Sequence, residues 1–329
     1  MEKKDIKINS INFPTKEDFK TINIGVSEVY GYKFGIMATG LDYYVIGFQN
    51  EREEDNIEHG IAFENVNKEW TLSWSTEFSI FSTVYSKKAE QIFLIGSNGD
   101  VEVTTKDEAW DEIIDSSENG PSSLRNINGA CVIGEHVYVV GMRRQVYRRV
   151  LESRSWDRFD DGCFVQNATT EIFGLNAIHG LTESEIYAVG FRGEIWCYNN
   201  SKWNQIESPA EINLYSVCKL NKGDVIVGGG LGTLLRGNSH GFSSINHNIT
   251  EYSITSIVEF YNKIFITDEN GGLFELIEDK LIVISDFSVS DSGGGHLNAN
   301  NEALIYTCTN FVLIFDGTNW TNISPPDEC

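Results

Sequence analysis

The sequence predicts an all-β fold, a seven-bladed β-propeller built from four-stranded antiparallel blades. A strand–turn–strand unit is clearest at Ile186–Trp203, IYAVGFRGEIWCYNNSKW. One strand ends at Gly190, Phe191-Arg192-Gly193 suits a tight turn, and a second strand runs to Tyr198. A hairpin cannot bury its own faces, so the number of copies decides the fold. No extended helical periodicity competes with this interpretation.

The unit recurs seven times along the chain. The residue that ends its first strand falls at positions 47, 96, 141, 190, 228, 267 and 307, so successive gaps are 49, 45, 49, 38, 39 and 40 residues. A period near 40 with several short strands per copy is typical of propellers. The last two copies carry Thr267 and Thr307 in place of glycine, and Phe242 replaces the closing tryptophan in the fifth copy.

Two further strands complete each copy. One precedes the hairpin, as at 175–179, 214–218 and 254–260, and one follows the tryptophan, as at Trp203–Ile206. Four strands in each of seven units give one propeller domain over residues 1–329. Residues 1–30 are predicted to be a lead-in or to supply a strand, at 6–8 or 22–24, that closes the ring.

The amino-acid sequence of the repeats resembles that of a known group of proteins. The segment LNAIHGLTESEIYAVGFRGEIWCYNNSKWNQIESP is similar to bacterial propeller repeats of the WAVGxxGxIxxYDGxxW type, which are WD40- and BNR-like. The resemblance is clearest over residues 170–240 and extends to 80–160 and 300–320. It implies a seven-bladed propeller and no particular function, because propellers serve many roles. The sialidase-type Asp-box is echoed only in part, at Asp316–Trp320.

The bulk composition excludes some classes of partner. The formal net charge is −23, which disfavours nucleic acid and anionic membranes and attracts basic proteins, although solubility alone would also explain it. The N-terminus, MEKKDIKINS, lacks the apolar core of a secretory signal, so a cytoplasmic protein is expected. The six cysteines are scattered without a CxxC pair and are expected to be buried thiols, with no metal or cofactor.

No catalytic constellation emerges from the remaining polar residues. His179 on an inner strand could act as a base in the central channel, but a satisfied structural histidine is the better interpretation. Asp268–Gly272 reads as a hairpin turn rather than a calcium loop, and the glycines at 228–232 precede a strand rather than a helix. The arginines at 143, 144, 148, 149, 154 and 158 all belong to one blade, whereas a sialidase-type site would draw on several.

Topology places the acidic loops together. The turn between the second and third strands of a blade shares a face with the link to the next blade. That face is predicted to be an acidic rim with aromatic points at Phe48, Phe191 and Phe311, interrupted by Arg143, Arg144 and Arg192. The predicted partner-binding residues are Glu51, Glu53, Glu54, Asp55, Asp160, Asp161, Phe191, Arg192, Asp268 and Glu269. A merely solvated loop face is the competing interpretation.

These observations predict a non-enzymatic propeller that binds another protein. The sharpest hypothesis is a bacterial immunity protein that neutralises a basic toxin by occluding its active cleft, because acidic inhibitors meet basic domains by electrostatic steering. A general scaffold for protein interaction or assembly is one alternative. A sialidase-like, carbohydrate-active enzyme is another.

Overall fold

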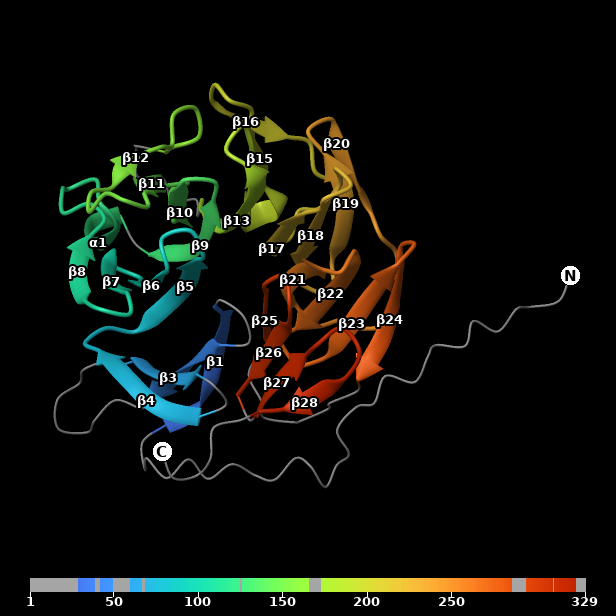
Figure 1. Ribbon diagram of the computed structural model, residues 1–329. Coiled ribbons are helices and arrows are strands. Elements are labelled where there is room, and N and C mark those ends of the chain that lie inside the picture. Colours follow the sequence, from blue (N-terminus) through green and yellow to red (C-terminus); the bar gives the residue numbers. More distant parts are fainter. Residues whose placement is uncertain are drawn as a thin grey trace, which may run out of the picture.

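The chain forms a ring of seven blades in the computed structural model (Figure 1). The structure describes residues 29–38, 42–49, 60–66, 69–124, 126–165, 173–285, 294–309 and 311–323. Within these ranges each four-stranded antiparallel sheet consists of four consecutive strands, which confirms the predicted fold class. The helical content there is one turn, α1 (Pro121–Leu124), and one 3₁₀ turn, η1 (Phe191–Gly193).

The strands follow the order inner to outer in every blade. The first three blades are β1 (Val29–Met37), β2 (Tyr43–Gln49), β3 (Gly60–Val66) and β4 (Glu69–Thr76); β5 (Ile80–Ser86), β6 (Gln91–Gly96), β7 (Asp100–Thr104) and β8 (Ala109–Ile113); and β9 (Ile127–Ile133), β10 (His136–Gly141), β11 (Val146–Val150) and β12 (Asp157–Arg158).

The remaining four blades repeat this plan. They are β13 (Leu175–Thr182), β14 (Glu185–Gly190), β15 (Ile195–Tyr198) and β16 (Trp203–Ile206); β17 (Leu214–Lys219), β18 (Val225–Gly229), β19 (Leu234–Asn238) and β20 (Gly241–Ser244); β21 (Ile254–Phe260), β22 (Lys263–Asp268), β23 (Leu273–Ile277) and β24 (Lys280–Ser285); and β25 (His296–Ala299), β26 (Leu304–Cys308), β27 (Phe311–Phe315) and β28 (Trp320–Asn322).

Hydrophobic cores lie between neighbouring blades. Strand β14 shows how its alternation builds two of them: Ile186 and Ala188 face blade 3, whereas Tyr187 and Val189 face blade 5. Because side chains in a strand alternate between its faces, a central strand buried on both sides must be apolar throughout. Trp203 fills the boundary between blades 3 and 4, where its indole N–H donates to the Phe159 carbonyl at 2.7 Å.

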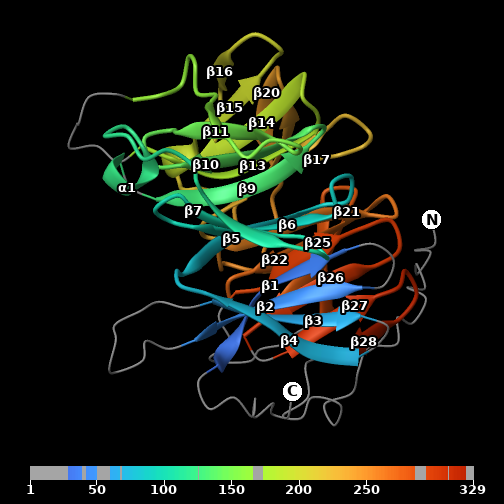
Figure 2. The same cartoon turned by 60° about the vertical axis from the view of Figure 1, so that its left-hand side comes forward.

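Blade 1 packs directly against blade 7 to close the ring. Figures 1 and 2 both show β1 beside β25 and β26. Met37 and Val45 share a core with Ile305 and Val312, and the Met37 N–H donates to Asn298 Oδ1 at 3.0 Å. Blade 7 draws its four strands from residues 296–322. The predicted ring-closing segments at 6–8 and 22–24 lie outside the described residues.

Side chains of the inner strands join one blade to the next. Register shifts mark Asn128, Asn176 and Thr255 on these strands. Their side chains, like that of Ser216, donate to a carbonyl of the next blade, on Leu175, Leu214, Gly295 and Ile254 respectively. A bulge turns a side chain out of the regular ladder, which gives it this reach.

The repeat marker shifts by one residue in two blades. Gly96, Gly141 and Gly190 each pair with the first residue of their inner strand. The corresponding residues in blades 5 and 6 are Gly229 and Asp268, whereas the comparison of the seven repeats predicted Gly228 and Thr267. The glycine has a steric cause, since a Cβ on Gly190 would lie 1.9 Å from the Gly174 carbonyl oxygen.

Candidate protein-binding face

The loops of the propeller form two opposite faces. We call "linker face" the one that carries the second-to-third-strand turns, residues 97–99, 142–145, 191–194, 230–233 and 269–272, and the links between blades, residues 77–79, 114–124, 159–165, 207–213 and 245–253. The other turns form the "hairpin face". Because successive strands are antiparallel, a chain that enters each blade on the linker face returns to it after the second and fourth strands.

Three turns on the linker face share one backbone geometry. Arg143, Arg192 and Leu231 occupy the same place in blades 3, 4 and 5, with φ of 57°, 55° and 50°. The residue before each donates its N–H to a carbonyl of the preceding link, at Asn126, Gly174 and Asn213 respectively. Left-handed φ is costly for residues other than glycine, so the surrounding hydrogen bonds hold these three side chains at the tips of their turns.

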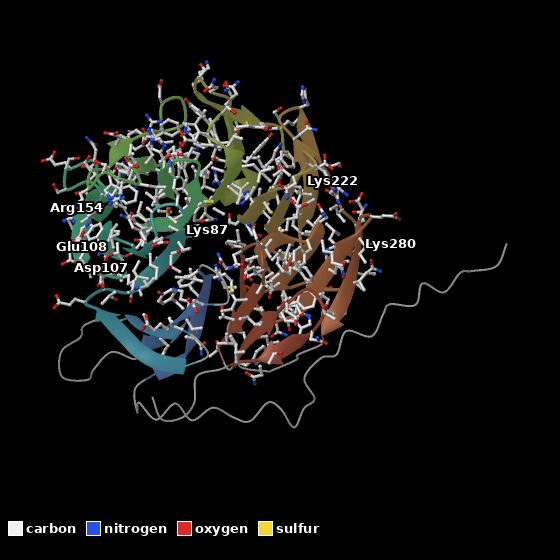
Figure 3. The ribbon with its side chains drawn as sticks, in the orientation of Figure 1. Lys87, Asp107, Glu108, Arg154, Lys222 and Lys280 are labelled. Atoms are coloured by element: carbon white, nitrogen blue, oxygen red, sulfur yellow. The ribbon has the colours of Figure 1, made fainter. Side chains whose placement is uncertain are left out.

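Charge is distributed unequally between the two faces. Among the described residues, every lysine except Lys33 lies on or beside the hairpin face: Lys87, Lys88, Lys106, Lys202, Lys219, Lys222, Lys263 and Lys280. Figure 3 labels three of them, Lys87, Lys222 and Lys280. The linker face exposes acidic side chains at Glu77, Glu118, Asp161, Glu207, Glu211, Glu251 and Glu269. Its described cations are Lys33, whose ammonium group donates to the Ile80 carbonyl, and arginines concentrated in blades 3 and 4. Blades 5 and 6 therefore carry the part of this face that is acidic without interruption among the described residues.

The predicted contact residues fall into three groups in the structure. Glu51, Glu53, Glu54 and Asp55 lie outside the described residues. Asp161, Arg192 and Glu269 are exposed on the linker face, and Phe191 beside them is half-buried against Gly174. Asp160 and Asp268 are buried. For all ten predicted contact residues, a role in binding a partner stays a prediction.

The two buried carboxylates stabilise local structure. Asp160 accepts a hydrogen bond from Arg158 Nε at 2.8 Å, and burial raises the pKa of its carboxyl group. Asp268 is 2% exposed; its Oδ1 accepts the N–H groups of Asn270 and Gly272, and its Oδ2 accepts the Thr250 hydroxyl at 2.6 Å. The segment 268–272 is a turn between β22 and β23, as the sequence predicted.

One predicted aromatic point is not exposed. Phe311 begins β27 and is 4% exposed, with its ring edge-on to Tyr306. It is already within the β26–β27 ladder, where it pairs with Cys308, and its side chain packs into the core between blades 6 and 7. Phe311 is therefore part of the scaffold, contrary to the sequence prediction of an aromatic on the rim.

Three arginines of blade 3 form ion pairs with acids of neighbouring blades. Arg144 forms a bidentate pair with Glu194 of blade 4, with Nε 2.7 Å from Oε2. Arg154 pairs with Glu108 of blade 2 at 3.1 Å on the hairpin face, where Figure 3 shows the two side by side. A sialidase-type site needs such arginines for the substrate carboxylate. Here they connect blades.

The most buried pair joins blades 2 and 3. Arg149 has a side chain with 0% exposure, and its Nε and Nη2 donate to the Glu112 carboxylate at 2.8 Å each. The indole N–H groups of Trp110 and Trp156 donate to the same carboxylate, at 2.7 and 2.9 Å. Bidentate, charge-assisted bonds of this kind fix geometry strongly, so this pair aligns the two blades.

His179 and the cysteines also serve the scaffold. The His179 Nδ1 accepts the Lys219 N–H at 3.0 Å, and burial lowers the pKa of the imidazole to about 4. None of Cys131, Cys163, Cys197, Cys218 and Cys308 forms a disulfide, and all but Cys131 are buried. Burial raises the pKa of the Cys218 thiol to about 12. The expectation of buried thiols is confirmed for Cys163, Cys197, Cys218 and Cys308, whereas Cys131 is only partly buried and Cys329 lies outside the described part.

The linker face also has a groove with exposed apolar side chains set among polar ones, which sequence reasoning missed. Leu231 is 77% exposed, and Ile249, Tyr252 and Val283 nearby are 46%, 49% and 44% exposed. They border two adjoining hollows of ≈ 630 and ≈ 510 Å³ between blades 5 and 6, which share Leu231, Ile249, Thr250 and Glu251. One feature of the sequence could have indicated this groove. Leu231 is an isolated leucine within the glycine run 228–232, at the turn position that holds arginine in two other blades.

The described residues lack both a metal-binding cluster and a membrane-spanning helix. They contain no group of three or more His, Cys, Asp or Glu side chains arranged to hold a metal ion. Over the same residues, no helix is both long and apolar enough to cross a membrane.

Known proteins resemble this chain in sequence and in fold. It is 27% identical over 285 residues to Immune protein Tsi7 of Pseudomonas aeruginosa, which covers 85% of this chain and 92% of that protein. No family model matches. Among solved structures, the WD40 propeller domain of Doa1 aligns with a TM-score of 0.63 at 11% identity, over 88% of this chain and 96% of that one. YCF48 from Cyanidioschyzon merolae aligns at 0.54 and 16% identity, over 76% and 88%.

Proposed function

We propose that this chain is an immunity protein, a non-enzymatic propeller that binds a toxin and neutralises it. The observation that carries the proposal is the similarity to Immune protein Tsi7, which extends over 85% of this chain and 92% of the relative. A similarity of that extent covers the blades together rather than one repeat. The propeller fold supports the same conclusion, because a closed ring offers a rigid surface for another protein.

The partner in this proposal is a basic toxin domain, and the mechanism is occlusion of its active cleft by the linker face. The charge of −23 and the exposed acids of that face support the choice of a basic partner. An acidic face accelerates encounter with a basic protein and disfavours neutral or acidic ones. A cytoplasmic location belongs to the proposal and is supported by the five described cysteines, none of which forms a disulfide.

Two other functions have less support. A general interaction scaffold shares the protein-binding property, and one propeller of similar fold is described as YCF48 bound to D1 peptide, with 12% identity and a TM-score of 0.52. The carbohydrate-active alternative is weakened because Arg144, Arg149, Arg154 and Arg158 pair with acids of the protein itself. That alternative would be established if the protein hydrolysed a sialoside and the substitution of one carboxylate abolished this activity.

The test uses the protein encoded by the reading frame adjacent to this one. Expressed alone in a bacterial host it should arrest growth, and co-expression with this chain should restore growth, whereas an unrelated acidic protein should not. The purified pair should associate at a rate that falls at least tenfold between roughly 20 and 500 mM salt. If the adjacent product neither arrests growth nor binds this chain, the immunity function is wrong. A rate insensitive to salt would remove the basic partner from it.

A further inference from the structure

The hollow between blades 5 and 6 is a groove with apolar edges. We call "blade 5–6 groove" the surface formed by Leu231, Ile249, Thr250, Glu251, Tyr252 and Val283. Leu231 projects from the turn between β18 and β19, Ile249 to Tyr252 belong to the link from β20 to β21, and Val283 lies on β24. Contiguous exposed apolar side chains in a hollow mark a site of interaction more often than scattered ones do.

Leu231 has no function in the fold that explains its presence. Its backbone lies in the left-handed region, where asparagine or glycine is cheaper, and its side chain is 77% exposed. The equivalent residues of blades 3 and 4 are Arg143 and Arg192, so the turn itself does not require an apolar side chain. A leucine that leaves most of its surface exposed at this tip is better explained by a contact outside the molecule.

The walls of the groove are fixed by hydrogen bonds. The Thr250 hydroxyl donates to Asp268 Oδ2 at 2.6 Å, the Gly232 N–H donates to the Tyr252 carbonyl at 3.0 Å, and His247 Nε2 donates to the Gly232 carbonyl at 2.7 Å. The link 245–253 is thus tied to the turns of both blades. A surface ordered before binding loses less conformational entropy when a partner arrives.

The charge of the groove is acidic. Glu251 lies in the wall shared by the two hollows and is exposed, and Glu269 is exposed beside Ser253, whose N–H it accepts at 3.0 Å. The carboxylate of Asp268 is already occupied within the turn. No lysine or arginine is among the described residues that line either hollow. The complementary ligand is therefore an apolar side chain flanked by cations.

We propose that the blade 5–6 groove receives a surface loop of the toxin that presents an apolar side chain between lysine or arginine residues. This rests on the proposed immunity function and specifies where on the linker face the partner docks. Leu231, Ile249 and Tyr252 bury the apolar side chain of that loop, and Glu251 and Glu269 bind its cations. Interfaces depend most on such a desolvated apolar centre with a polar rim.

Two substitutions test the groove against the protein encoded by the adjacent reading frame. Leu231→Asn keeps the net charge and suits the left-handed backbone, and it should weaken binding at least tenfold. Glu251→Lys should slow association several-fold at low salt and less at high salt. Matched controls on the opposite face are Leu181→Asn, at a leucine 47% exposed, and Glu302→Lys; both should bind within twofold of the unmodified chain. Thermal unfolding shows that each variant is folded.

Photo-crosslinking identifies the occupant directly. A benzoylphenylalanine at position 231 should crosslink to a segment of the adjacent-frame protein that carries an apolar residue with lysine or arginine beside it, and the same probe at position 181 should not. A crosslink to residues 1–28 of this chain or to a second copy of it would overturn the proposal. So would an acidic target segment.

The outcomes separate this proposal from the function on which it rests. If the unmodified chain binds the adjacent-frame protein and protects against it, but Leu231→Asn and Glu251→Lys bind like their controls, the groove is wrong and the immunity function stands. If the unmodified chain neither binds nor protects, both are overturned.

Discussion

Removal of Arg149 should destabilise the propeller far more than removal of a superficially similar arginine. Arg149→Met leaves the Glu112 carboxylate, 4% exposed, with two indole N–H donors and no counter-charge. Breaking a buried pair on one side costs about 3–5 kcal/mol. At roughly 2 °C per kcal/mol for a chain of this size, the midpoint of thermal unfolding should fall by about 6–10 °C.

A neighbouring arginine supplies the matched control. Arg154 joins the same two blades through Glu108, but both side chains are 58% exposed (Figure 3). An exposed pair contributes less than about 1 kcal/mol, so Arg154→Met should move the midpoint by about 2 °C or less. Tryptophan fluorescence during urea unfolding provides a second measure, because Trp110 and Trp156 both donate to Glu112.

A double variant isolates the buried charge as the cause. Glu112→Gln combined with Arg149→Met removes the uncompensated carboxylate and leaves an amide oxygen to accept an indole N–H. The double variant should therefore be more stable than Arg149→Met alone, by at least about 1 kcal/mol. The reasoning is refuted if Arg149→Met costs no more than Arg154→Met, or if the two buried substitutions are additive.

Two further predictions concern a turn glycine and a partly buried carboxyl group. Gly193→Ala should lower the free energy of unfolding by at least about 3 kcal/mol, because φ is 74° there and a Cβ would lie 1.8 Å from the Ala210 carbonyl oxygen. Gly223→Ala is the control: φ is 101° and no atom lies within 4 Å of the added Cβ, so the loss should be only about 1–2 kcal/mol. Urea unfolding measures both losses. Burial, with the charge of Asp111 opposite, raises the pKa of Glu102 to about 7. Because the pKa is higher in the folded state than in the unfolded state, ionisation of Glu102 destabilises the fold. Glu102→Gln should therefore be more stable than the unmodified chain at pH 8, by about 1 kcal/mol after solvent screening. This difference in stability should disappear as the pH falls from 7 to 4.5. An advantage that persists at pH 4 would contradict the assigned cause.

The sequence predicted the blades well because their signal is local and repeated. The alternation within β14 and the glycine before its turn are properties of neighbouring residues, and seven copies make them legible together. The one-residue shift to Gly229 and Asp268 was not readable. In the run Gly228–Gly230 any glycine could end the strand, and the pairing with Leu214 decides which one does.

The candidate site was less predictable because it depends on contacts distant in sequence. The sequence suggested that Asp268 is a surface acid, but its carboxylate accepts a hydrogen bond from the hydroxyl of Thr250, which lies 18 residues earlier. The structural arginines could have been found. Arg149 and Glu112 lie 37 residues apart and Arg144 and Glu194 lie 50 apart, which is about one repeat in each case. Opposite charges separated by one blade are candidates for pairing across a blade boundary.

The immunity function was predicted from charge and repeats, and the similarity to Immune protein Tsi7 supports it. The location of binding was predicted only as a face. The acids at positions 51–55, outside the described residues, and the exposed acids of blades 5 and 6 would attract the same kind of partner, so charge alone does not choose between them. The blade 5–6 groove distinguishes blades 5 and 6, because it combines charge with exposed apolar side chains that a partner can desolvate.

The turn tips show how recognition can vary while the scaffold stays constant. Arg143, Arg192 and Leu231 project from the same backbone, held in each blade by a hydrogen bond from the preceding residue to the previous link. The scaffold fixes these positions through atoms that the side chain does not supply, so an arginine and a leucine are equally compatible with the turn. Substitution there changes which chemistry the linker face presents and leaves the cores between blades untouched. A propeller of this design can therefore exchange one partner for another at its tips without a change of fold.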